Sequence, residues 1–170
     1  KDGEAQIERG MIAIGRPAAA LPERGLNVGI SARSLDLDAW QSLLGGGRKG
    51  AEVAAAGLPV AVDVKADELV VIGQTYTGVV VGITGITTRW RGNVESEQAI
   101  GNFQWDGSGA GRLKAHFSKW RRPDRVRSDT TSREPLKELP ALDVIVDDFT
   151  IGQKRFGRLE VQAHNDGGIW

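Results

Sequence analysis

Short runs in which apolar and polar residues alternate constrain this chain more than any other feature of its sequence. Residues 60–64 read Val-Ala-Val-Asp-Val, and residues 142–146 read Leu-Asp-Val-Ile-Val. Similar runs at 26–30, 113–117 and 159–161 are separated by Gly, Pro, Asn and Asp. Successive side chains of a β-strand point to opposite faces of the sheet, so a two-residue period predicts strands with one apolar face. The sequence therefore predicts a mainly β fold.

Two short stretches predict helices. Residues 38–44 have an acidic first turn and then Trp40, Leu43 and Leu44 on one side, and three glycines follow. Residues 49–56 are Ala-rich. Neither helix is long enough to be stable alone, so we expect the first to fold back onto the sheet.

An internal repeat organises the predicted strands. One unit opens with Leu58-Pro59 and passes through Ile72-Gly73-Gln74, and the other opens with Leu139-Pro140 and passes through Ile151-Gly152-Gln153. Each unit predicts two strands, a turn at Ile-Gly-Gln and a third strand, which is a β-meander used twice. We therefore expect an extended antiparallel sheet built from repeated units, with one or two short helices.

The chain is expected to form a single β-rich unit over residues 1–170. Residues 121–138 are rich in Arg, Pro and Ser and contain few apolar side chains. Such a segment cannot bury enough surface to offset its conformational entropy, so it is predicted to be a flexible loop. An ordered surface loop is the alternative.

Composition excludes several classes of function. The chain has 22 Lys and Arg against 22 Asp and Glu, and this zero net charge argues against a general nucleic-acid-binding protein. It has no Cys and two His, which argues against disulfides, thiolate catalysis and common metal sites. We expect no metal and no cofactor. The opening Lys1-Asp2-Gly3-Glu4 is not a signal peptide, and we expect the chain to be a piece of a longer protein.

No catalytic constellation stands out, so the chain is not expected to be an enzyme. The glycine-rich stretch at 45–50 lacks the spacing of a phosphate-binding loop. Asp147 and Asp148 would point to opposite faces of a strand, so a turn is predicted there. His116 is expected to be a solvated strand residue. A hydrolase built on these three residues remains a further hypothesis.

The tryptophans leave two interpretations open. The five tryptophans can pack at sheet edges, or they can line a rim that faces lipid: Trp40, Trp90, Trp105, Trp120 and Trp170.

Several short segments occur along the chain in a characteristic order. They are LPERGLNV at 21–28, LDLDAW at 35–40, GAGRLKAHFSKW at 109–120, LPALDVIVDDF at 139–149, GRLEVQA at 157–163, and Trp170. Together, in this order and spacing, they resemble the YhdP branch of the AsmA-like proteins of Gram-negative bacteria. Phe117 and Trp120 stand where Leu is more usual in that family.

The resemblance implies a fold and a function. Such proteins are anchored in the inner membrane by one N-terminal helix and extend into the periplasm. Their long curved sheet forms an apolar groove for phospholipid acyl chains that move between the inner and outer membranes. By this resemblance, the chain is a fragment of the C-terminal half, and the membrane anchor lies outside it.

The apolar positions of the predicted strands are the candidate groove residues, and acyl chains of phospholipids are the expected partners. An ordinary covered core is the alternative for any one of them. A second functional hypothesis is an adaptor that binds other envelope proteins through strand edges or through residues 121–133. The candidate groove residues are Val60, Val62, Val64, Val79, Val81, Leu113, Phe117, Leu142, Val144, Val146, Leu159 and Val161.

Overall fold

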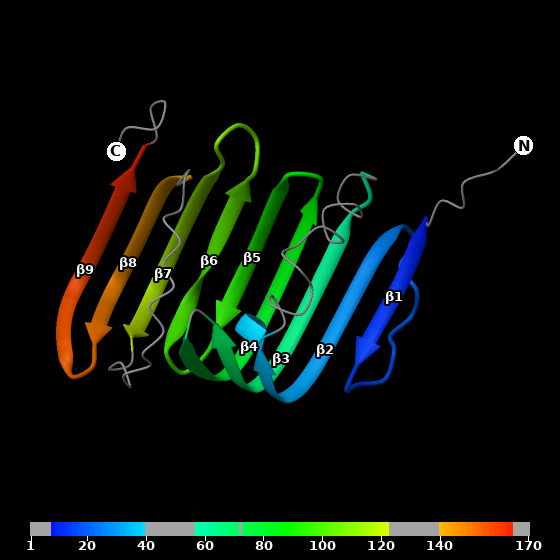
Figure 1. Ribbon diagram of the computed structural model, residues 1–170, viewed down its shortest axis with the longest axis horizontal. Helices are drawn as coiled ribbons and strands as arrows, with labels where there is room; N and C mark the ends of the chain where they lie inside the picture. The colour runs from blue at the N-terminus through cyan, green and yellow to red at the C-terminus, as the bar shows by residue number, and fades with distance from the viewer. Residues whose placement is uncertain (1–7, 40–56, 72, 123–139, 165–170) are drawn as a thin grey trace, which may run out of the picture.

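One mixed, mostly antiparallel sheet contains all the strands of the computed structural model, which describes residues 8–39, 57–71, 73–122 and 140–164 (Figure 1). The nine strands lie side by side in the order of the sequence. The predicted mainly β fold is confirmed. The strands are β1 (Arg9–Ile14), β2 (Gly25–Asp36), β3 (Val60–Val71), β4 (Gln74–Ile86), β5 (Arg89–Glu95), β6 (Ala99–Asp106), β7 (Arg112–Arg122), β8 (Ala141–Ile151) and β9 (Lys154–Ala163).

Three of the strand pairs are parallel. The pairs β1–β2, β2–β3 and β7–β8 run parallel, and all others run antiparallel. Antiparallel neighbours need only a tight turn, as at Thr87-Thr88 between β4 and β5. Parallel neighbours need a longer connection, and β2 ends at Asp36 whereas β3 begins at Val60.

The repeated unit contains two long strands, where the sequence pattern predicted three. The run at 60–64 and the second strand predicted between it and the turn at Ile72-Gly73 belong to one strand, β3, which ends at Val71. The predicted turns do occur, at Gly73 with φ +65° and Gly152 with φ +56°. Both φ values are easily adopted only by glycine. The repeat is therefore a hairpin, β3–β4 and then β8–β9, and each hairpin joins the preceding strand in parallel.

The two parallel pairings that join these hairpins to the sheet begin with a glycine beside a proline. The Leu26 N–H donates to the Pro59 carbonyl over 2.9 Å, and the Ala141 N–H donates to the Gly111 carbonyl over 2.9 Å. Gly25 has φ +90° and Gly111 has φ +85°. A side chain on Gly25 would collide with the Pro59 carbonyl oxygen.

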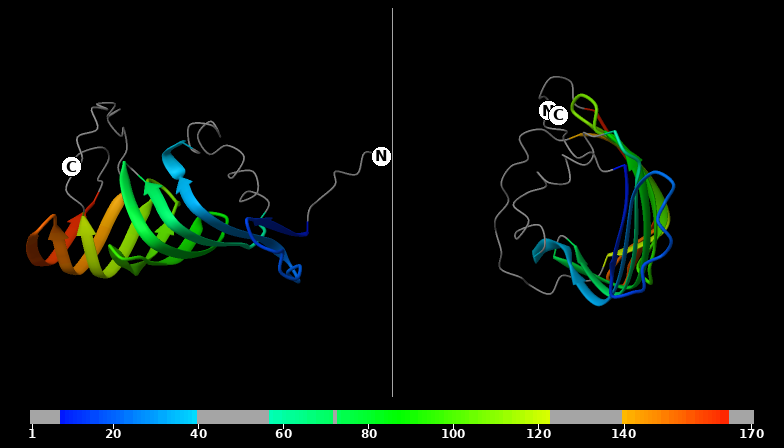
Figure 2. Two further views of the ribbon diagram at one scale, coloured as in Figure 1. Left: turned by 90° about the horizontal axis from the view of Figure 1, so that it is seen from below. Right: turned by 90° about the vertical axis from the view of Figure 1, so that its right-hand side faces the viewer.

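The sheet bows along its strands, so that one face is concave (Figure 2). A local core on this face consists of Leu35, Ala66, Leu69 and Val79, with Tyr76 packed against it. After β2, residues 37–39 form a helical turn that Asp36 caps, because its carboxylate accepts the Ala39 N–H over 2.8 Å.

Parts of three predicted segments lie outside the described residues. The predicted helix at 38–44 is described only as far as Ala39, and the one at 49–56 is not described. The first two residues of the predicted loop at 121–138, Arg121 and Arg122, belong to β7 instead. The remaining residues of that loop, 123–138, lie outside the described part.

Replacing Gly25 by Ala is expected to lower the free energy of unfolding by about 1–3 kcal/mol, because it combines a strained φ with a collision against Pro59. Chemical denaturation followed by circular dichroism measures this change. Gly109→Ala is the matched control, since Gly109 has φ +60° and nothing within 4 Å of an added Cβ. Equal losses for the two variants would show that the contact with Pro59 is unimportant.

Candidate functional site

Strand alternation and register together place apolar side chains in continuous rows across the sheet. Three rows of paired positions cross all nine strands and contain only apolar residues and glycine. We call the face that carries them the apolar face. The rows are Ile12-Val28-Val62-Ile83-Gly92-Phe103-Ala115-Val144-Val161, Ile14-Ile30-Val64-Val81-Val94-Gly101-Phe117-Val146-Leu159 and Gly10-Leu26-Val60-Gly85-Trp90-Trp105-Leu113-Leu142-Ala163.

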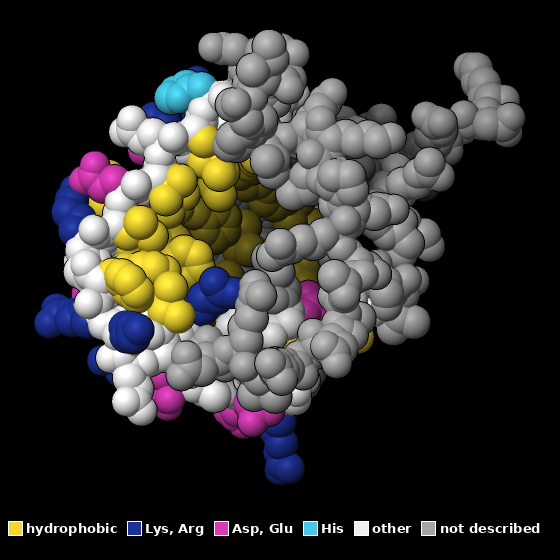
Figure 3. All heavy atoms as spheres, turned by 60° about the vertical axis from the view of Figure 1, so that its left-hand side comes forward, with side chains coloured by type: hydrophobic (Ala, Val, Ile, Leu, Met, Phe, Trp, Pro, Cys, Tyr) yellow, Lys and Arg dark blue, Asp and Glu magenta, His cyan; other side chains and the backbone are white. Residues whose placement is uncertain are grey.

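The structure brings all the candidate groove residues named from the sequence to the apolar face. Eleven lie in the three rows, and Val79 lies in the adjoining row opposite Ala66. Their exposure is uneven, since Val79 and Val146 are buried whereas Val161 is 38% exposed. Figure 3 shows hydrophobic side chains gathered in the hollow of the bowed sheet.

Large rings on the apolar face cover neighbouring glycines. A Cβ on Gly92 would lie 2.7 Å from the Phe103 ring, and one on Gly101 would lie 2.6 Å from the Phe117 ring. Gly85 is covered by Trp90 in the same way. A ring that fills the space over a glycine on the next strand keeps the face continuous.

Sequence reasoning did not identify Phe103, and it left Trp90 and Trp105 open between a sheet edge and a rim that faces lipid. Each stands at an alternate position of its run, beside Gly or polar residues. That alternation was the signal for them, but the facing glycines are visible only once the register is known.

Four aromatic side chains form a chain of contacts across β7, β8 and β9. Ring centroids are 5.4 Å apart for Phe117 and Trp120, 5.8 Å for Trp120 and Phe149, and 6.0 Å for Phe149 and Phe156. Register shifts in β6–β7 and β8–β9 accompany this arrangement. Phe156 is 61% exposed, so the aromatic chain extends to solvent at one rim of the sheet.

Asp147 and Asp148 do not form the predicted turn, because both lie within β8, at a break in its register with β9. Two residues of β8, Asp147 and Asp148, oppose the single residue Arg158 of β9, and such a β-bulge changes where the side chains point. Asp147 accepts hydrogen bonds from His116 over 2.8 Å and from Arg158 over 2.9 Å. Asp148 accepts one from Arg155 over 2.7 Å. These carboxylates are thus paired in exposed ion pairs.

His116 occupies the exposed strand position that the sequence predicted. Its side chain is 53% exposed, and its Nε2 contacts Asp147. The sequence did not indicate this pairing, because His116 and Asp147 are 31 residues apart.

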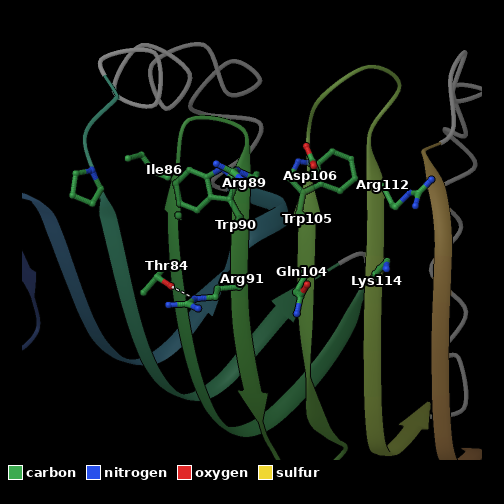
Figure 4. A pocket seen from close by; sticks show the side chains of 12 residues that line it. Thr84, Ile86, Arg89, Trp90, Arg91, Gln104, Trp105, Asp106, Arg112 and Lys114 are labelled. Carbon is green, nitrogen blue, oxygen red and sulfur yellow. Dashed lines mark hydrogen bonds between the residues drawn. The ribbon is translucent and has the colours of Figure 1, made fainter.

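The opposite face of the sheet is mainly polar, although Val80, Ile86 and Ile100 are exposed on it, and we call it the polar face. A shallow pocket of about 690 Å³ lies where β5 begins, β6 ends and β7 begins, and it is lined by side chains of the polar face together with Trp90 and Trp105 at the rim (Figure 4). Four cations line the pocket, and we call them the cationic patch: Arg89, Arg91, Arg112 and Lys114.

Asp106 is the carboxylate within this pocket. The Ser108 hydroxyl donates to it over 2.6 Å, and the Ser108 N–H donates over 3.0 Å. These hydrogen bonds, assisted by the charges of Arg89 and Arg112, hold the pKa of Asp106 below its ordinary value of 3.8.

The comparison with known protein families covers the whole chain. The YhdP protein family matches residues 1–170. The chain belongs to the YhdP family. The resemblance seen in the sequence is thereby confirmed. No curated protein and no solved structure matches this YhdP-family chain.

Neither a membrane-spanning helix nor a metal cluster occurs among the described residues of this YhdP-family chain. None of the described helical segments is long and apolar enough to cross a membrane. No group of three or more His, Cys, Asp or Glu side chains in the described ranges is arranged to hold a metal ion.

Replacing Ser108 by Ala is expected to raise the pKa of Asp106 toward 3.8, because the hydroxyl hydrogen bond favours the charged carboxylate. An NMR titration of the carboxyl carbons measures this pKa directly. Ser34→Ala, at an exposed position of β2, is the control and should leave it unchanged. A Ser108→Ala chain with an unaltered Asp106 pKa would assign the lowering to the backbone N–H of residue 108 and the neighbouring arginines.

Proposed function

We propose that this chain is part of a non-enzymatic phospholipid transporter of the periplasm. In this proposal the apolar face shields acyl chains that move between the inner and outer membranes, which supports the permeability barrier of the outer membrane. In this proposal the full-length protein is anchored in the inner membrane, as the resemblance to the family implies. The observation that carries the proposal is the set of three apolar rows that cross all nine strands.

The size of the apolar face suits an acyl chain. Eight steps of about 4.8 Å between neighbouring strands give each row a length of about 38 Å. One acyl chain spans half of a bilayer's hydrocarbon core, which is about 15 Å. Each row is therefore long enough to cover a whole chain lying across the strands.

Burial of apolar surface supplies the binding energy in this proposal. Each CH₂ group removed from water contributes about 0.8 kcal/mol, and the exposed apolar surface of the sheet is covered at the same time. Half-exposed side chains such as Val161, at 38%, would become buried under an acyl chain. The three rows of the apolar face contain no polar side chains, so in this proposal the face binds acyl chains without distinguishing between headgroups.

Two substitutions within one row test the proposal. Val62 and Val144 both belong to the row that begins at Ile12. A chain with Val62→Asp and Val144→Asp is expected to lose bound phospholipid, because two charges would face the acyl chain. The measurement is lipid extraction and mass spectrometry on protein purified without detergent, with circular dichroism to verify folding.

The matched control places the same charges on the polar face of the same strands. Ala61 and Ile145 are the neighbours of Val62 and Val144, and they point to the other side of the sheet. Ala61→Asp with Ile145→Asp should retain phospholipid at the wild-type level. Loss of lipid in both double variants would mean that acyl chains do not lie on the apolar face.

An adaptor role rests on the two edge strands. Within the described sheet β1 and β9 are each paired on one side only, and β1 exposes Ile12 at 46% and Ile14 at 42%. Such an edge can accept a further strand from another protein. A folded wild-type chain that carries no phospholipid would contradict transport and favour this second function.

A further inference from the structure

The cationic patch on the polar face has a regular geometry. The patch consists of two rows of paired residues on β5, β6 and β7. In each row, a β6 residue with a side-chain oxygen lies between two cationic residues. Arg89 and Arg112 flank Asp106, and Arg91 and Lys114 flank Gln104. Neighbouring strands lie about 4.8 Å apart, so the four cationic residues begin within about 10 Å of one another across the strands.

The four cationic side chains of the patch are not neutralised by the ion pairs found among the described residues. The ion pairs there involve His116, Arg155 and Arg158, and none of the four patch cations. Asp106 offsets part of the charge but is held by Ser108, and Arg91 donates a hydrogen bond to the uncharged Thr84 hydroxyl over 3.3 Å. Like charges this close repel one another, and an anionic surface above them would relieve the repulsion.

The patch lies at a rim of the sheet. Arg89 is the first residue of β5, Asp106 is the last of β6 and Arg112 is the first of β7. At the same rim, Trp90 and Trp105 are half-buried neighbours in one row of the apolar face. Trp beside Arg and Lys is the combination that proteins place at the boundary between lipid and water.

We propose that this rim docks on the headgroup layer of a membrane that contains anionic phospholipids, with the cationic patch against the lipid phosphates. All four cationic side chains are exposed, and the pocket between them is shallow and open, which suits a flat array of phosphates. The anionic surface of such a membrane attracts Lys and Arg side chains that come within about one Debye length of it. This docking does not depend on whether the apolar face binds acyl chains.

Vesicle co-sedimentation tests the docking. We expect the wild-type chain to bind vesicles made of equal parts phosphatidylglycerol and phosphatidylcholine, and not vesicles of phosphatidylcholine alone. Binding should fall steeply as salt is raised toward about 1 M, because the ions screen the charges. A chain with Arg89, Arg91, Arg112 and Lys114 all changed to Gln should bind at least about tenfold more weakly, since each charge contributes roughly fivefold.

A matched variant separates this site from a general effect of charge. Changing the exposed residues Arg9, Arg33, Lys65 and Lys154 to Gln removes the same four charges elsewhere on the chain and should leave vesicle binding within about twofold. Equal weakening by both variants would overturn the proposal. Equal binding to both kinds of vesicle would also overturn it.

Two further measurements distinguish the docking surface from a discrete phosphate site and from the apolar face. Inorganic phosphate, added at constant ionic strength, should not displace the vesicles, and displacement would indicate a discrete phosphate site in place of a docking surface. The chain with Val62→Asp and Val144→Asp should still bind anionic vesicles. Its loss of vesicle binding would assign the membrane contact to the apolar face, and so would overturn the docking proposal.

Discussion

The register between neighbouring strands is the constraint on which the rest of this structure depends. Because side chains alternate along a strand, a slip of one residue at any pairing would move the apolar side chains of that strand to the polar face. Val62 would then exchange places with Ala61 or Asp63, and the row from Ile12 to Val161 would be broken. The continuous apolar face therefore requires each of the eight pairings to be correct.

Glycine and proline set several of these pairings. Gly25 beside Pro59 and Gly111 beside Pro140 mark the starts of two parallel pairs, where the chain has no tight turn to fix the alignment. Elsewhere, rings that lie over Gly85, Gly92 and Gly101 join adjacent strands on the apolar face. At these positions a neighbouring ring or backbone atom occupies the space that a side chain would need, so only glycine fits. This requirement accounts for part of the high glycine content of the strands.

The two faces of the sheet suggest separate roles at one rim. The apolar face offers a long surface for acyl chains, and the polar face carries the cationic patch beside the same strand ends. Lipid transfer needs a protein both to approach a membrane and to shield an apolar cargo. We propose that the two tasks depend on opposite faces of one single-layered sheet, so substitutions can separate them.

The sequence by itself determined the strand content, the turns at Gly73 and Gly152, and which side chains share a face, because a two-residue period is a local property of each strand. It also carried the family resemblance. It did not reveal that 60–71 is one strand, that three pairs are parallel, or that Asp147 and Asp148 lie in a bulge. Nor did it bring Arg89 near Lys114 or His116 near Asp147. Those features depend on which strands become neighbours and in what register, and only the tertiary structure decides that, because the pairing partners are distant in sequence.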